Sequence, residues 1–545
     1  MIVMKFNEKA RGKSRYAKHP TATLNKEGGL AFSLSPKAEL TQLVASCFVN
    51  EQRFYDSSGS DSIDRIAQLV DIVAEEDPEY VVQLAVYARH VLYLRSVSEY
   101  LIVLASRHLK ARKFVRKYVP HVLTRADQPT EALACLIGIE GHVGRLGDGK
   151  LAKSLQRGIA DALHNFNEYD LGKYLKADAE VKLSDVIKLT HPKAWGNEKK
   201  AALWKKVLEN KLESPDTWEV ITAQEGSNTE SWTKAAKVMP YFATLRNLRN
   251  LLQHKVEMTG VLDRLTKRDA VLNNKLFPFR YYSAYSSIED IQSEYTSATL
   301  DAIETAMDIS VENLPVLPGK TLIAADNSGS MDHQISDKST VTARDIANML
   351  LSMGHKMCEV PLTVVFATDC KQVNIPKRNG VISGMKAAQE VAGRVGEATY
   401  GYKVIKLLVD NKIKVDRIVL LTDEQLYNQS GGHAYWGTPA DHKDDRGKSF
   451  QQWLAEYRQI VNPDCRLYSI NLVGYGHTLM PEGDSKSLLV QGWSDKILSY
   501  IPQFEQDAKT VVQRIKEGIK PDKEAIKAFV KSHSSGENDV ITAEQ

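Results

Sequence analysis

Oxygen-bearing side chains gather where one apolar run of this 545-residue chain ends. Residues 322–325 predict a buried strand, and Asp326, Ser328 and Ser330 follow it in an Asp-x-Ser-x-Ser pattern. Hard divalent cations take oxygen ligands, and Mg²⁺ keeps several waters when the protein supplies only a few. The spacing therefore predicts a cation site with Mg²⁺ as the expected ion. This stretch taken alone is explained as well by a plain turn rich in Ser, Asp and Gly.

Two further segments favour the cation site over the plain turn. Residues 417–423 form a second apolar run, which ends in Asp423, and the intervening segment 396–401 carries Thr399 between two glycines. Strands that alternate with helices predict a mostly parallel, doubly wound α/β sheet, whose ligands lie at the carboxyl ends of the strands. We therefore expect Asp326 and Asp423 to meet at one edge of such a sheet.

The three segments together resemble the metal-ion-dependent adhesion site of von Willebrand factor A domains. The resemblance implies that Asp326, Ser328 and Ser330 bind the ion directly or through water. It implies further that Thr399 joins when the site is open and that Asp423 holds the ion through water.

The elements before this region read as helices from residue 35 to residue 306. The first begins at Ser35-Pro36, and its apolar residues Leu40, Leu43 and Val44 recur on one face. The following segments repeat this style, with short connections that carry Pro, Gly or Asp. A series of paired helices predicts a stacked array of the HEAT type. The expected fold class is thus an all-α array followed by a doubly wound α/β domain.

The amino-acid composition is that of a globular protein. A hydrophobic content of 43% and a charged content of 26% are ordinary for a globular protein, and the length predicts two or more domains. No apolar run approaches twenty residues, and the five cysteines form no CxxC pair, so we expect no membrane span and a cytoplasmic location. No P-loop or nucleophile–base pair stands out, which favours a binding protein over an enzyme.

A net charge of +3 means that any affinity for nucleic acid must come from local patches. Residues 107–125 contain no acid, and on a helix Lys110, Lys113 and Lys117 share one stripe. An RNA phosphate track and a solvated helix face are both open interpretations. The candidate RNA-contact residues of this run are Arg107, Lys110, Lys113, Arg116 and Lys117.

Three stretches resemble the TROVE module of the Ro autoantigen family, and the whole chain resembles a bacterial-type member. They are residues 183–193, 240–250 and 277–280. The order of modules is also that of the family, with the A domain after the helices. The resemblance implies a TROVE-type helical domain over 1–315, an A domain with its adhesion site over 316–502, and a C-terminal helix and disordered tail over 503–545.

In this family the helices curve into a closed monomeric ring that the A domain holds together. The resemblance implies that small structured noncoding RNAs, the Y RNAs, bind the outer surface, and that single-stranded 3′ ends of misfolded RNAs enter the central hole. His191 matches the ring-lining His of the family, and Lys173 and Lys176 match the basic residues upstream of it. Asp178 or a neighbour stands where the family has an Arg. Arg246 is a further candidate contact, although a salt-bridged helix face also explains it.

The favoured hypothesis is therefore an RNA-binding ring protein that acts in RNA quality control or as a scaffold for an exoribonuclease. The alternative is a metal-dependent protein-adhesion module that uses the helical array as a platform. A chelatase-like accessory subunit is a third, weaker hypothesis.

Overall fold

The computed structural model describes residues 19–46, 61–140, 151–174, 179–334, 341–427 and 448–532, apart from 214, 216, 277, 377, 493–497, 499 and 508. Internal contacts divide the chain into two compact units. The helical unit comprises residues 63–261 and 512–532, and the A unit comprises 1–62, 262–511 and 533–545.

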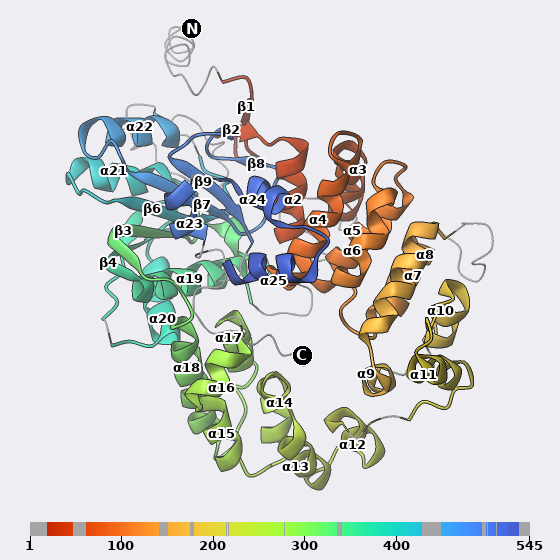
Figure 1. Cartoon of the computed structure of the whole chain (residues 1–545). Helices are drawn as coiled ribbons and strands as arrows, with labels where there is room; N and C mark the ends of the chain where they lie inside the picture. The colour runs from red at the N-terminus through yellow and green to blue at the C-terminus, as the bar shows by residue number, and fades with distance from the viewer. Residues whose placement is uncertain are drawn as a thin grey trace. The chain divides into compact units, whose positions relative to one another are not determined.

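The helical unit confirms the predicted series of helices (Figure 1). On α4, Val81, Leu84, Ala85 and Ala88 are fully buried, and so are the residues between them, because the helix is buried on all sides from Tyr80 to Ala88. The helices are α3 (Asp61–Glu76), α4 (Pro78–His90), α5 (Arg95–Arg107), α6 (Arg112–Val122), α7 (Gln128–Glu140), α8 (Lys153–Ala162), η1 (Leu163–Asn165), α9 (Glu168–Lys173), α10 (Leu183–Thr190), α11 (Glu198–Leu208), α12 (Trp218–Gln224), α13 (Thr229–Val238) and α14 (Tyr241–Gln253).

Helices α6 and α8 pack especially closely. A Cβ added to Gly158 of α8 would lie only 2.8 Å from the Cβ of Val119 on α6. Glycine at this position therefore permits the two backbones to approach. The opposite face of α6, with Lys113 and Lys117, is exposed to solvent.

The C-terminal helices belong to the helical unit. Helix α24 (Val511–Gly518) lies within the segment 503–545, where a C-terminal helix is predicted, and α25 (Lys523–Ser532) is a further helix in this segment. Gln83 of α4 donates a hydrogen bond to the carbonyl of Ile519 at 2.8 Å, and Tyr87 meets Phe529 edge to face. The tail expected to be disordered lies almost entirely outside the described residues.

The A unit contains the predicted doubly wound sheet, in the order β5-β4-β3-β6-β7-β9 (Figure 1). All neighbours are parallel except β4 and β5. The strands are β3 (Leu317–Asp326), β4 (Cys358–Phe366), β5 (Cys370–Gln372), β6 (Arg417–Thr422), β7 (Arg466–Asn471) and β9 (Ser487–Gln491).

Alternate residues of β3 point to opposite faces of this sheet, so helices cover both. Leu322 and Ala324 pack in one core with side chains of α21 (Tyr402–Asp410) and α22 (Phe450–Ile460). Ile323 faces α19 (Ala343–Met357) on the other side, together with α20 (Val381–Ala392). Burial on both faces explains why β3 and β6 read as continuous apolar runs.

The A unit also includes helices that the sequence groups with the helical array. They are α2 (Pro36–Ser46), α16 (Arg268–Asn274), α17 (Pro278–Ser286) and α18 (Thr296–Val311), whereas the boundary after Val261 falls within α15 (Thr259–Thr266). Glu304 of α18 accepts hydrogen bonds from the backbone and side chain of Ser383 on α20. The compact units therefore divide the chain differently from the predicted boundary at 315.

A small sheet at the start of the chain was not predicted. Strands β1 (Ala22–Leu24) and β2 (Leu30–Ser33) form a hairpin, which we call the N-terminal hairpin, and β2 pairs with β8 (His477–Thr478). The hairpin thus joins the A unit. Among the residues that the structure describes, none of the helices combines the length and the hydrophobicity that a membrane span requires.

Candidate functional site

The five predicted metal ligands come from three segments at the carboxyl edge of the sheet, where β3 and its neighbour β6 end. Asp326 ends β3, Asp423 follows β6, and Ser328 and Ser330 lie on the loop and short η2 (Gly329–Asp332) after β3. All five side chains, Thr399 included, are at most 5% exposed. The carboxylates and hydroxyls therefore lie inside the protein, where polar groups require partners.

Hydrogen bonds fix the first of these carboxylates. The Thr422 hydroxyl donates to Asp326 Oδ2 at 2.6 Å, and the Ser328 backbone N–H donates to Asp326 Oδ1 at 3.0 Å. The hydroxyls of Ser328 and Ser330 lie 3.4 Å apart. Asp326 is therefore held in one orientation beside two hydroxyl oxygens.

The three segments are also tied to one another through their backbones. Gly329 N–H donates to the carbonyl of Glu397 at 3.0 Å, and Tyr427 N–H donates to the carbonyl of Thr399 at 2.8 Å. The segment that carries Thr399 is thus bonded on one side to the serine loop and on the other to the loop after β6. The segments that carry Ser328, Thr399 and Asp423 therefore lie next to one another, as the sequence predicts.

Asp423 has an unsatisfied oxygen. Its Oδ1 accepts a hydrogen bond from Gln425 N–H at 3.0 Å, but among the described residues its buried Oδ2 has no hydrogen-bond partner. Burial raises the pKa of Asp423, and the negative charge of Asp326 raises it further. Burial also raises the pKa of Asp326. Two buried carboxylates that repel each other are a site that a cation would stabilise.

These residues fit a hard divalent cation. Asp326, Ser328 and Ser330 would hold it, Thr399 would approach it, and Asp423 Oδ2 would receive the positive charge or a bound water that it lacks in the protein alone. The described residues contain no cluster of three or more His, Cys, Asp or Glu side chains. A soft-metal site of His and Cys is therefore not what this edge offers.

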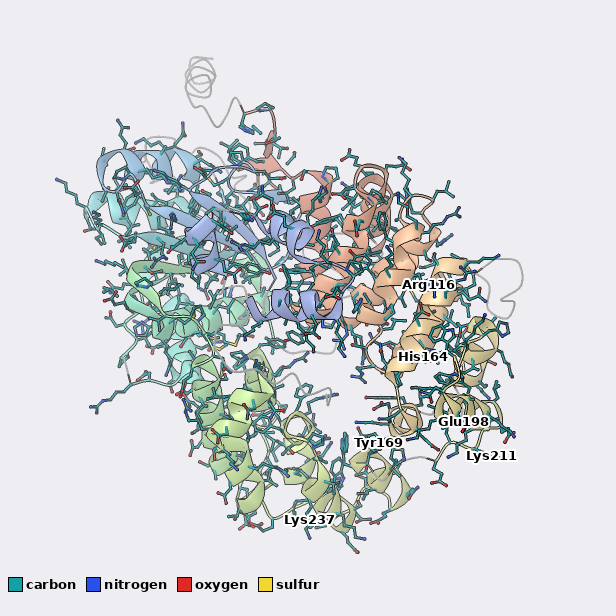
Figure 2. The ribbon with its side chains drawn as sticks, viewed as in Figure 1. Arg116, His164, Tyr169, Glu198, Lys211 and Lys237 are labelled. Carbon is teal, nitrogen blue, oxygen red and sulfur yellow. The ribbon has the colours of Figure 1, made fainter. Side chains whose placement is uncertain are left out.

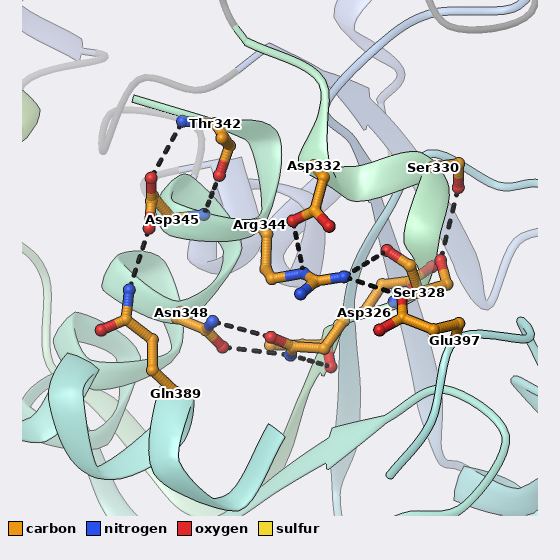
Figure 3. Close-up of polar contacts among 12 residues, drawn as sticks. Asp326, Ser328, Ser330, Asp332, Thr342, Arg344, Asp345, Asn348, Gln389 and Glu397 are labelled. Carbon is orange, nitrogen blue, oxygen red and sulfur yellow. Dashed lines mark hydrogen bonds and ion pairs between the residues drawn. The ribbon is translucent and has the colours of Figure 1, made fainter. Parts of the chain in front are cut away.

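Arg344 is a site residue that sequence reasoning missed. Arg344 lies in the first turn of α19. Its guanidinium donates hydrogen bonds to the carbonyl of Ser328 at 3.1 Å and to the carboxylate of Glu397 at 3.2 Å, and it forms an ion pair with Asp332 (Figure 3). Behind it, Asn348 exchanges two hydrogen bonds with Asn327. Arg344 and Asn348 hold the loop of Ser328 and Ser330 from α19. No spacing signal links them to this loop, because their partners lie 12 or more positions away in the sequence.

Strand β7 stabilises the loop after β6 through Glu424. Glu424 has a positive φ of 64°, which is unfavourable for a residue with a Cβ, and its side chain is fully buried. Ser469 and Asn471 of β7 donate hydrogen bonds to its carboxylate. Burial raises the pKa of Glu424, and these two donors oppose that shift. Glu424 thus anchors the turn that presents Asp423.

The N-terminal hairpin is hydrogen-bonded to the same loop through Asn25. The side chain of Asn25 is buried, and its Nδ2 donates to the carbonyls of Leu426 at 2.7 Å and Glu424 at 3.3 Å. Its Oδ1 accepts from the N–H groups of Glu27 and Gly29. One side chain therefore closes the hairpin turn and ties it to the loop that presents Asp423.

The basic run predicted as an RNA track lies mostly on α6. Arg107 ends α5, and Arg107, Lys110, Lys113, Arg116 and Lys117 are all exposed. Lys110 forms an ion pair with Glu75, and Arg116, which is labelled in Figure 2, forms one with Asp161 at 2.8 Å. No acidic side chain among the described residues pairs with Lys113 or Lys117. Lys113 and Lys117 lie one turn apart on α6, and both positive charges are uncompensated within the described part of the chain.

Lys173 ends α9 beside an aromatic ring. Its Nζ lies 5.7 Å from the ring centre of Tyr174, and the guanidinium of Arg125 lies 5.0 Å from the same ring. Arg125 also forms an ion pair with Asp127 at 3.0 Å. The predicted contact Lys173 therefore belongs to a cation–aromatic cluster that the sequence did not reveal. Lys176 and Asp178 lie outside the described residues.

His191 is exposed at the carboxyl end of α10, with a left-handed φ of 48°. Pro192 follows it and prevents the helix from continuing. The helix begins at Leu183 after Lys182, and the side chain of Asp185 accepts a hydrogen bond from the Lys182 N–H at 3.1 Å. Arg246 is exposed on α14, with its guanidinium 5.7 Å from the ring centre of Phe242.

The chain is similar to known proteins over most of its length. The TROVE domain matches residues 35–210 and 207–301. Telomerase protein component 1 of Rattus norvegicus is 22% identical over 387 residues, and that of Mus musculus is 33% identical over 92 residues. These alignments cover 54% and 16% of this chain but only 14% and 4% of the relatives, so the chain spans a small part of their length.

The fold also matches a solved structure. The crystal structure of the Deinococcus radiodurans RO (RSR) protein superposes with a TM-score of 0.57 at 16% sequence identity, over 92% of this chain and 100% of that chain. The TROVE match covers helices of both compact units, and the structural match extends through the sheet. The chain therefore belongs to the TROVE family and has the fold of a Ro protein.

Proposed function

We propose that this protein binds RNA: small structured noncoding RNAs of the Y type on its outer surface, and single-stranded 3′ ends of misfolded RNAs in a central hole. It would thereby act in RNA quality control or hold RNA for an exoribonuclease. Membership in the TROVE family supports the class, and the exposed cations within the matched region support the chemistry. Ring closure around a monomer is part of this proposal, and solution scattering of the full chain tests it.

The observation that carries the proposal is the exposed face of α6. Lys113 and Lys117 lie one turn apart on it, and the described residues supply no acid to neutralise them. Cations without acidic partners are free to contact phosphates, and the contact gains free energy through release of counterions from RNA. Such contacts select charge and shape rather than base sequence.

Substitution separates the outer surface from the hole. Lys113→Glu with Lys117→Glu should weaken binding of a structured RNA at least tenfold at low salt, as measured by filter binding. Lys237→Glu, at an exposed position of α13 in the same unit (Figure 2), is the matched control and should leave binding unchanged.

Lys173→Ala with His191→Ala should weaken binding only of RNA that carries a single-stranded 3′ tail. Equal binding by all variants would refute the assignment of these residues.

A second function, metal-dependent adhesion to a protein, is favoured by the buried, unpartnered Oδ2 of Asp423. Here a divalent cation, most simply Mg²⁺, would supply an open coordination position for a carboxylate of the partner. Calorimetric titration with Mg²⁺ or Mn²⁺ should show one site that Asp423→Ala removes. Heat unchanged by this substitution would refute the metal site without bearing on RNA binding. The two functions are compatible.

A further inference from the structure

Trp195 is exposed in a way that core packing does not explain. Its side chain is 68% exposed, and its φ of 43° is left-handed, as is that of the next residue, Gly196, at 78°. Left-handed backbone at a bulky residue costs free energy. The chain thus holds a large aromatic ring in solvent at an energetic cost, and such an arrangement is typical of a functional position.

The ring is held in place although it is exposed. The rings of Trp195 and His164 are stacked, with centroids 4.7 Å apart and planes 13° from parallel. His164 lies on η1, labelled in Figure 2, and meets the buried ring of Trp204 edge to face at 5.9 Å. His164 covers one face of the indole, and the large exposed fraction leaves the other face open. The three rings form a shelf with a fixed orientation, so little side-chain entropy remains to be lost on binding.

Basic residues flank Trp195 along the chain. His191 and Lys193 are exposed on the same loop, four and two residues before Trp195, and Lys199 is exposed on α11 just after it. Lys200 lies over the ring of Trp204. Glu198 is the one acidic residue between 186 and 208, a segment that the structure describes completely. An aromatic face bordered by positive charge suits a ligand that has both a flat ring and a phosphate.

We infer that Trp195, backed by His164, is a stacking site for an unpaired base of RNA. The inference rests on the proposed RNA binding and deepens it: it adds a contact to a base where the other candidate residues contact phosphates. Every base has a π face, so the site would be tolerant of sequence. Paired bases inside a duplex already stack on their neighbours, so the site would require a single-stranded segment.

Fluorescence anisotropy with a labelled ten-nucleotide oligouridylate tests this site in the full chain. Replacement of a stacked aromatic residue by Ala costs roughly 5- to 100-fold in affinity per base. Trp195→Ala should therefore weaken oligouridylate binding by that factor, and Trp195→Phe should restore most of it. Val238→Ala, at another exposed apolar position of the helical unit, is the control and should have no effect.

Two readouts distinguish stacking from a merely structural role. The slope of affinity against salt should be the same in Trp195→Ala as in the unmodified protein, because stacking releases no counterions, and binding of a blunt RNA duplex should be unchanged. RNA binding that Trp195→Ala leaves intact overturns the stacking site alone. Equal loss of duplex and single-strand binding also overturns it, since it indicates a damaged loop. No RNA binding by the unmodified protein overturns the proposed function as well.

Discussion

Glu99 of α5 is a carboxyl side chain buried among helices. It is 4% exposed, and Gln128 donates a hydrogen bond to it at 2.6 Å. Burial raises the pKa of Glu99 to about 8, and the charges of Glu131 and Asp127 add to this shift while Gln128 and Arg95 oppose it. The folded state therefore keeps a proton at pH 7 that the unfolded chain gives up near pH 4.5.

The sign of the resulting pH dependence follows. Between the unfolded and the folded pKa the folded state binds more protons, so the free energy of unfolding falls as pH rises from about 4.5 to about 8. Glu99→Gln should remove this contribution and raise the urea midpoint of the helical unit at pH 8.5 more than at pH 5. The opposite order would show that Glu99 is charged in the folded state.

At the scale of single residues, the sequence revealed the candidate ligands but not the residues that hold them in position. Asp326, Ser328 and Ser330 stand out because three oxygens alternate after an apolar run. Arg344 and Asn25 do not, because their hydrogen bonds to the site cross 16 and about 400 residues of chain. Contacts of that kind are decided by the tertiary fold and leave no local pattern.

Among the elements, the N-terminal hairpin is the one whose role is most directly testable. Asn25→Ala would leave the carbonyls of Glu424 and Leu426 without their donor. An unsatisfied buried acceptor costs about 1–3 kcal/mol. Amide hydrogen exchange in residues 423–427 should therefore accelerate roughly five- to a hundredfold. Leu24→Ala, at an exposed position of the same hairpin, should leave exchange there unchanged.

Helix α25 offers a second test at this scale. Phe529 is buried, meets Tyr87 of α4, and lies where a Cβ on Gly518 would overlap its ring. Phe529→Ala should destabilise the docking of α24 and α25 by about 3–5 kcal/mol. Limited proteolysis should then cut after residue 510 first. Glu524→Ala, which removes only an exposed ion pair with Lys527, should not change the cleavage pattern.

The elements themselves were largely predictable, for a physical reason. Helices such as α6, which buries Val115, Tyr118, Val119 and Val122, carry their buried apolar residues on one face. Strands β3 and β6 are buried on both faces, so periodicity and run length identify these elements. Strands β1, β2 and β8 are short, and β8 has two residues. A strand this short has no period to detect, and its pairing depends on distant chain.

For the molecule as a whole, a net charge of +3 gives weak long-range attraction to RNA, so affinity must depend on local cations. The logarithm of affinity for single-stranded RNA should fall with the logarithm of salt concentration, with a slope of about 0.7 per phosphate contact. Lys113→Glu with Lys117→Glu should reduce the slope for structured RNA by roughly 1–2. Affinity independent of salt would contradict a phosphate-based interface.

The pairing of β2 with β8 has a consequence for how the protein is made. Residues 32 and 33 align with 478 and 477, at the other end of the polypeptide. While the ribosome is still at work, the outer edge of β2 has no strand to pair with and exposes its N–H and C=O groups. Strand β2 therefore cannot complete its pairing until residue 478 has been synthesised, and a translation product that stops before this residue would carry an open β edge prone to aggregation.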